Sequence, residues 1–174
     1  MKLLFNLVTL SPQSQSIKLK LPFLKQLEVS GICELFPILN AAPNVDYMII
    51  HFDCLKILLD DESTCRLLQT QIIRLNVTDW IDVKSDLLQR VSQVFRSLCH
   101  IVITMKDSTV LIDDFVLKIL SLWKGKSRLS VDVKGSMSED KKKNLIQWLT
   151  TYSHITRDDS FAVECKDNWF DLWY

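Results

Sequence analysis

The side chains best suited to chemistry in this 174-residue sequence are three histidines and five cysteines, and they are scattered along the chain. His51, His100 and His154 lie far apart. His100 directly follows Cys99, but neighbouring residues of a strand point to opposite faces, so the two cannot form a nucleophile–base pair through this adjacency. No two cysteines form a CxxC pair, and none lies beside a histidine at metal-ligand spacing. The sequence therefore predicts no catalytic residue and no metal site.

One segment, "WKGKS" at 123–127, ends like a phosphate-binding loop. Such a loop needs a glycine five residues before Gly125, where this chain has Leu120, and it follows a strand instead of leading into one. The chain has three glycines in all, which argues against a dinucleotide-binding loop as well. We therefore expect a protein that is not an enzyme and needs no cofactor.

Composition narrows the class of partner. Lys plus Arg and Asp plus Glu number 21 each, so the net charge is zero and the phosphate-driven attraction of a nucleic-acid binder is absent. No apolar run approaches the length of a membrane span. An odd number of dispersed cysteines fits reduced thiols that pack as small apolar residues. We expect an intracellular protein, cytoplasmic or nuclear, whose partners are proteins and neither nucleic acid nor membrane.

A short phrase recurs along the chain with apolar residues in the order apolar-x-x-apolar-x-apolar. Copies in "PFLKQLEV", "PNVDYMII", "QIIRLNVTDW" and "RSLCHIVI" are followed by incomplete copies in "KSRLSVDV" and "DDSFAVEC". Alternation over so few residues is typical of a half-buried strand. The anchor residues recur at intervals of 21 to 32 residues, and they are Leu27, Met48, Leu75, Ile101, Leu129 and Phe161. The recurrence of one strand pattern at a near-constant interval indicates a solenoid of stacked repeats.

Helical patterns separate these strands, at residues 53–68, 84–95, 113–123 and 136–152. The last begins with "SMSE", in which Ser136 and Glu139 have the spacing of a capping box. Its apolar face is expected to consist of Leu145, Trp148, Leu149 and Tyr152. Strands that alternate with helices at this period predict an α/β fold of parallel strands joined by helical crossovers.

The stretches "LPFLKQLEVSG", "APNVDYMIIHF" and "SLCHIVITM" resemble the leucine-rich repeats that follow the F-box in many eukaryotic F-box proteins. In that family "P-x-L-x-x-L-x-L" marks a strand on the concave side of a horseshoe. The Asn or Cys that usually follows the strand is matched once, by Cys54, and no F-box is visible in this chain. The resemblance implies a leucine-rich-repeat-like solenoid that recognises substrates for a cullin-type ubiquitin ligase.

On this interpretation residues 1–174 form a single repeat domain. Residues 1–20 are an irregular N-terminal segment or first strand, 21–165 form five to six repeats, and 166–174 are an aromatic C-terminal cap. Strand residues that do not point into the core would line the concave face. We predict protein binding there by a mixed polar and aromatic set, since Tyr and Arg often anchor interfaces: Tyr47, His51, Arg74, Asn76, His100, Arg128 and Asp132.

Two alternatives stay open. These side chains could be ordinary solvated strand residues, with recognition elsewhere or nowhere on the chain. The stretches "YMIIHF" and "HIVITM" are also apolar at both alternations, as in a strand covered on both faces, so a doubly wound α/β domain with a small-ligand or enzymatic site is the alternative fold. Strand order distinguishes the two folds, because a solenoid adds each strand at the same growing edge, whereas a doubly wound sheet reverses.

Overall fold

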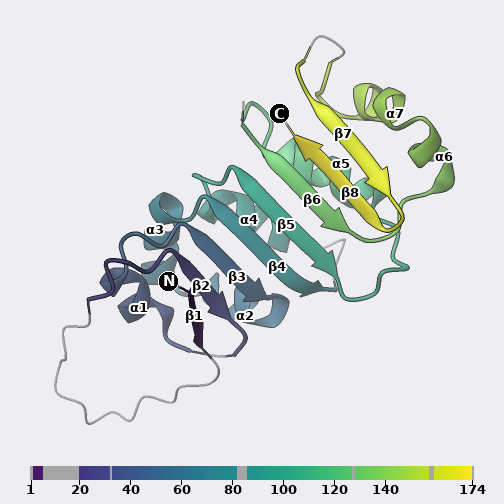
Figure 1. Cartoon of the computed structure of the whole chain (residues 1–174). Coiled ribbons are helices and arrows are strands. Elements are labelled where there is room, and N and C mark those ends of the chain that lie inside the picture. The colour runs from purple at the N-terminus through teal and green to yellow at the C-terminus, as the bar shows by residue number, and fades with distance from the viewer. Residues whose placement is uncertain are drawn as a thin grey trace.

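A computed structural model describes residues 2–5, 20–31, 33–81, 86–126, 128–156 and 159–173, and for residues 2–5 the backbone alone. Within these residues the chain is an α/β domain built on one open, mostly parallel sheet with helices (Figure 1). The strands are β1 (Lys2–Phe5), β2 (Gln26–Val29), β3 (Tyr47–His51), β4 (Arg74–Trp80), β5 (His100–Met105), β6 (Ser130–Lys134), β7 (Ala162–Lys166) and β8 (Trp169–Trp173). No described helix combines the length and the hydrophobicity needed to cross a bilayer.

The strands lie side by side in the order β1-β2-β3-β4-β5-β6-β8-β7. The first six are parallel, and each is added beside the one before it in the sequence. Strand β8 then pairs antiparallel with β6, and β7 lies antiparallel outside β8. Strand order therefore runs in one direction from β1 to β6 and departs from sequence order at the C-terminal hairpin.

The recurring phrase corresponds to successive strands of this sheet. Its anchors Leu27, Met48, Leu75 and Ile101 lie in one row across the strands, as predicted. The next residue in that row is Val131, which is the partner of Ile101, so the predicted fifth anchor Leu129 was wrong by two residues. Leu129 is buried just before β6 and satisfies the same apolar pattern, which is why the pattern alone misplaced it.

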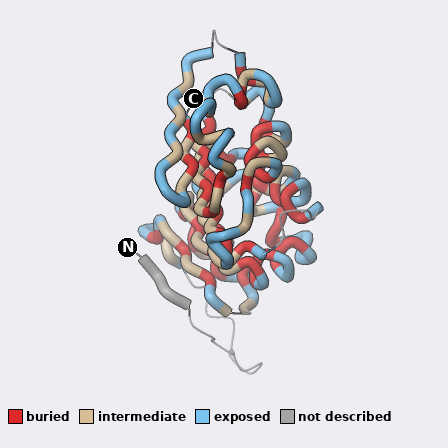
Figure 2. Tube along the Cα trace, turned by 90° about the vertical axis from the view of Figure 1, so that its right-hand side faces the viewer, coloured by how far each residue is buried: buried red, intermediate tan, exposed pale blue. Residues whose placement is uncertain are grey.

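Most of the helices that connect the strands lie behind the sheet in Figure 1, and the last two, between β6 and β7, appear beside β7. Figure 2 shows the buried residues concentrated between the sheet and the helices. The helices are α1 (Leu35–Ala41), α2 (Phe52–Leu58), α3 (Glu62–Gln71), α4 (Leu87–Val94), α5 (Asp113–Leu122), α6 (Glu139–Lys143) and α7 (Leu145–Tyr152). Alternate residues of β2 to β6 are buried against the helices, and the residues between them are half-buried, apart from the exposed Arg74 at the start of β4. One face of this sheet is therefore covered by helices.

The single helix predicted at residues 53–68 is wrong, because the structure has two helices there. The chain turns after α2, and Asp61 caps the second helix by accepting hydrogen bonds from the backbone N–H groups of Ser63 and Thr64. A carboxylate at this position satisfies N–H groups that have no partner within the helix. The apolar periodicity continues across the break, so periodicity did not reveal it.

The predicted capping box at Ser136 is also wrong. Ser136 forms an isolated bridge with Leu111, and the helical segment begins after Ser138, whose hydroxyl donates to Asp113 at 2.6 Å. Helices α6 and α7 replace the continuous helix expected over 136–152. Tyr152, predicted to face the core, is 64% exposed.

The C-terminal residues form a hairpin instead of a sixth parallel repeat. The stretch containing Phe161, Val163 and Cys165 does form a strand, but that strand pairs antiparallel with β8 and lies outside it. A two-residue turn joins the two strands, and Asp167 has a φ of 48°, which suits such a hairpin turn. Phe170 and Leu172 of β8 are fully buried beside β6. The proposed domain limits, including a C-terminal cap at 166–174, stay predictions, and Tyr174 lies outside the described residues.

Candidate functional site

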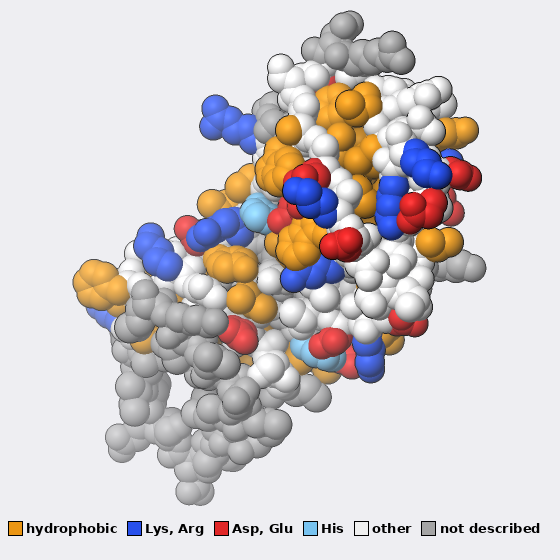
Figure 3. Space-filling view, turned by 45° about the vertical axis from the view of Figure 1, so that its right-hand side comes forward, with side chains coloured by type: hydrophobic (Ala, Val, Ile, Leu, Met, Phe, Trp, Pro, Cys, Tyr) orange, Lys and Arg blue, Asp and Glu red, His pale blue; other side chains and the backbone are white. Residues whose placement is uncertain are grey.

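The side of the sheet opposite the helices is the candidate interaction surface, and we call it the open face. Its residues alternate along β2 to β8 with residues that face the helices, which are buried except for the half-buried Val163 and Cys165 of β7. The open-face residues are Gln26, Glu28, Tyr47, Ile49, His51, Arg74, Asn76, Thr78, His100, Val102, Thr104, Ser130, Asp132, Lys134, Ala162, Glu164, Lys166, Trp169, Asp171 and Trp173. Figure 3 shows hydrophobic, cationic, acidic and histidine side chains intermixed on the side of the molecule that it presents.

Two predicted residues, Tyr47 and Arg74, form a pair on adjacent strands. They are partners in the β3–β4 register, and the Arg74 guanidinium lies 4.9 Å from the centre of the Tyr47 ring. The same guanidinium donates to Asp46 at 2.8 Å, which limits the positions it can adopt. Both side chains remain partly accessible, so the pair offers an aromatic and a cationic contact that are already positioned.

His51 is not close to the other predicted histidine. It lies at the end of β3, where its Nε2 is 3.1 Å from Asp79 and its Nδ1 accepts a hydrogen bond from the backbone of Asp53 at 3.3 Å. The second contact caps α2, so His51 has a structural role at the strand–helix junction. Strand β4 separates it from the strand that carries His100.

His100 and Asp132 are brought together by β5 and β6. The Nε2 atom of His100 lies 2.9 Å from Asp132 Oδ2, and the Asp132 side chain is 14% exposed. Ser130 is the register partner of His100, but its buried hydroxyl makes no hydrogen bond. A nucleophile–base contact of the serine hydrolase type is therefore not formed by these three residues.

The remaining two predicted residues have different surroundings. Asn76 lies on β4 in the open face, and its side-chain oxygen is buried without a hydrogen bond. Arg128 was expected within a strand, but it precedes β6 and is exposed in the loop. The two-residue register error at Leu129 accounts for this misplacement, because it extended the predicted strand backwards.

Sequence reasoning missed Asp171, which lies directly opposite Asp132 on β8. Burial, the negative charge of Asp132 and a hydrogen bond with that carboxyl raise the pKa of Asp171 from 3.8 to about 6. The Oδ1 atom of each carboxyl is buried and has no hydrogen-bond partner. A proton on Asp171 would satisfy both, since a protonated carboxyl can donate to an ionised one.

Two tryptophans on either side of Asp171 were interpreted as part of a cap and not as part of this face. Trp169 and Trp173 alternate with the buried Phe170 and Leu172, so they lie on the open face with Asp171. Lys134 of β6 lies over Trp169, with its Nζ 4.2 Å from the ring centre. The alternation in "WFDLW" was the signal for a strand with this orientation.

Metal chemistry finds no support in the arrangement of these side chains. In the part of the chain that the structure describes, no group of three or more His, Cys, Asp or Glu residues is arranged to hold a metal ion. What the open face offers is aromatic surface, two well-positioned cations and carboxylates on neighbouring strands. Such a mixture is suited to contact with another protein.

The fold and this surface define an α/β domain with a mostly parallel sheet, covered by helices on one face. Comparisons of the chain with protein-family models, with curated proteins and with solved structures found no match. They neither support nor contradict the resemblance to leucine-rich repeats. What the open face binds is therefore inferred from its own side chains.

Proposed function

We propose that this chain is a non-catalytic scaffold that recognises partner proteins through the open face. The observation that carries the proposal is the side of the sheet that no described helix covers, where side chains from seven neighbouring strands form one continuous surface. Its aromatic and arginine side chains, Tyr47, Arg74, Trp169 and Trp173, are of the types that contribute most at protein interfaces.

The solenoid interpretation of the fold is part of this proposal. Sequential order from β1 to β6, with helices behind the sheet, supports stacked strand–helix repeats. A doubly wound α/β domain is the alternative that an open α/β sheet also fits. Its ligand would bind where strand order reverses, and the parallel strands described here contain no such reversal.

The more specific proposal, substrate recognition for a ubiquitin ligase inside the cell, follows from the resemblance to the repeats of F-box proteins. Its support is limited to the recurring strand phrase, and its test is whether ligase subunits are recovered with the protein. Failure of this part would leave the open face as a protein-binding surface for another purpose.

The test is an affinity purification from native cell extract with the wild type and an Arg74→Glu, Lys134→Glu double variant. Both side chains lie on the open face and are at least partly accessible, so reversing their charge should leave the fold intact and remove partners that contact this face. Arg96→Glu, in the exposed turn after α4, is the matched control. Loss with the double variant alone supports the proposal, whereas partners retained by the double variant and lost with the control contradict it.

A further inference from the structure

Strand β7 leaves one edge of the sheet without a neighbouring strand among the described residues. In the two-residue hairpin, Lys166 and Trp169 flank the turn, and a flanking pair of this kind exchanges backbone hydrogen bonds. Hydrogen-bonded and non-hydrogen-bonded pairs alternate along the two strands, starting from this pair. Val163 and Cys165 therefore occupy positions whose backbone groups do not bond to β8. Their N–H and C=O groups therefore point outward, where another strand could bind.

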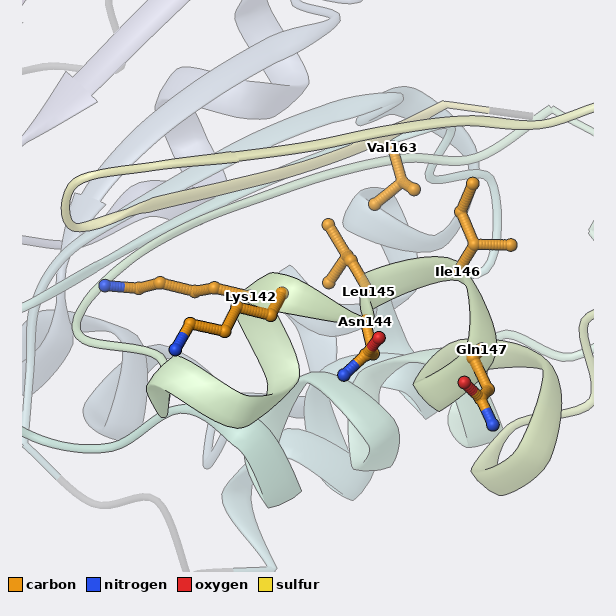
Figure 4. Close-up of a pocket in the computed structure, with 7 residues that line it drawn as sticks. Lys142, Asn144, Leu145, Ile146, Gln147 and Val163 are labelled. Carbon is orange, nitrogen blue, oxygen red and sulfur yellow. The ribbon is translucent and has the colours of Figure 1, made fainter.

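A shallow groove lies directly beneath this edge. It is lined by Val163 of β7 and by residues 142–147 of α6 and α7. Figure 4 shows Val163 pointing from the strand toward Leu145 and Ile146, which rise from the helical segment below it. Ile146 is 58% exposed, although its neighbour Leu145 packs against the core. The side chains of an added strand that point to the helical side would enter this apolar groove.

The charge beside the groove is positive. Lys142 and Lys143 both line it, and Lys143 is exposed. Lys142 lies 2.9 Å from Glu139, so part of its charge is already compensated. A bound segment carrying Asp or Glu next to its apolar residues would complement Lys143, whereas a basic segment would be repelled.

We propose that the outer edge of β7 binds an extended peptide segment of a partner protein, with apolar residues at alternate positions and acidic residues beside them. The peptide adds one strand to the sheet: its backbone bonds to Val163 and Cys165, its apolar side chains enter the groove, and its acidic residues face Lys143. This surface is separate from the open face and does not depend on what the open face binds.

A random peptide library displayed on phage, selected against the whole chain, tests the proposal, followed by affinity measurements with the enriched peptides made synthetically. We expect alternating apolar residues with Asp or Glu among them. Val163→Pro removes an outward N–H group without removing a β7–β8 bond, so it should weaken binding at least about tenfold. Val163→Thr keeps the N–H group and the shape of the side chain, and it should bind nearly as the wild type does.

Charge and groove are tested separately by Lys143→Glu and Ile146→Glu, each expected to weaken binding about fivefold or more. Lys25→Glu, an exposed lysine before β2 at the other end of the sheet, should have no effect. Thermal melting of each variant confirms that it is folded.

Failure to enrich such peptides, or undiminished binding to a folded Val163→Pro variant, would overturn the proposal. Sedimentation of the free chain examines the competing occupant, a second copy of the same chain. A dimer that dissociates in the Val163→Pro variant would assign the edge to self-association and likewise overturn the peptide proposal.

Discussion

At β3 and β4 the open face brings a cation onto an aromatic ring and beside a carboxylate, whereas at β6 and β8 it brings two carboxylates together. Arg74 is balanced by Asp46 and lies over Tyr47. Asp171 meets Asp132 with the partner histidine, His100, on the far side of Asp132. The two regions of this surface therefore differ in how charge is compensated. In the first an ion pair compensates it, whereas in the second a proton on Asp171 does so only below about pH 6.

The difference follows from topology. The first region lies between consecutive parallel strands, whose register repeats along the sheet. The second lies where the C-terminal hairpin joins the sheet in the antiparallel direction, so it combines residues from separate parts of the sequence. The hairpin thus supplies both the last buried layer of the core and the acidic, aromatic end of the open face.

Removing β8 should have the largest effect on stability. Deletion of residues 168–174 exposes the outer edge of β6 and removes the fully buried Phe170 and Leu172. Because each large apolar side chain lost from a core costs about 2–5 kcal/mol, we expect a loss of about 5 kcal/mol or more, seen as aggregation or a much lower melting temperature. Trp173→Ala, which truncates a partly exposed side chain, should cost about 1 kcal/mol and serves as the control. An unchanged melting curve with lost partner binding would show that these residues form an interaction patch and not a cap.

Asp171→Asn is expected to change the stability of the fold by an intermediate amount. The raised pKa means that the folded protein keeps a proton which the unfolded chain releases, so this carboxyl destabilises the fold increasingly as the pH rises from about 4 to about 6. The asparagine variant should be as stable as the wild type near pH 4 and about 1 kcal/mol more stable at pH 7, after allowance for solvent screening. Urea denaturation at several pH values measures the difference in stability between the variant and the wild type. Glu34→Gln, at an exposed carboxyl, is the control, and its difference from the wild type should not change with pH. A wild type that gains stability relative to Asp171→Asn as the pH rises would contradict the carboxyl pair.

The smallest effect is expected at the other region of the open face. Asp46→Asn removes the ion pair with Arg74, and because both side chains are partly exposed the loss should be about 0.5 kcal/mol at low salt. Added salt should reduce this difference further, since it screens exposed charges. Paired urea titrations of the wild type and the variant at low and high salt measure it. A loss of several kcal/mol that is insensitive to salt would mean that Asp46 stabilises the fold in another way.

The sequence predicted the strands better than the helices. Period-two alternation identified β2 to β5 in the correct register, because one buried face constrains every second residue. The helix break at Asp61 was missed because the apolar spacing continues through it. The break at Asn144 was missed because the predicted helix combined a capping-box spacing at Ser136 with an apolar face that begins only at Leu145. The fifth anchor was misplaced because Leu129 is buried and precedes the strand by a single residue.

For the candidate site, the sequence predicted residues but not their combinations. Tyr47 and Arg74 were predicted separately, and the parallel register makes them partners. Asp171 could not be predicted to meet Asp132, because β8 lies antiparallel between β6 and β7 and breaks the repeat that the earlier strands follow. Extrapolating a repeat to the end of the chain therefore located a strand at 161–165 and gave it the wrong neighbour.

The most direct test of the central claim is the affinity of a purified partner, recovered with the wild type, for variants on the two sides of the sheet. Tyr47→Ala and Trp173→Ala change partly exposed aromatic side chains of the open face, and Ile57→Ala changes an exposed residue of α2 on the helical side. Titration calorimetry should show a loss of about tenfold or more for the two aromatic variants and no change for Ile57→Ala. The reverse result, with binding lost only on the helical side, would contradict recognition through the open face.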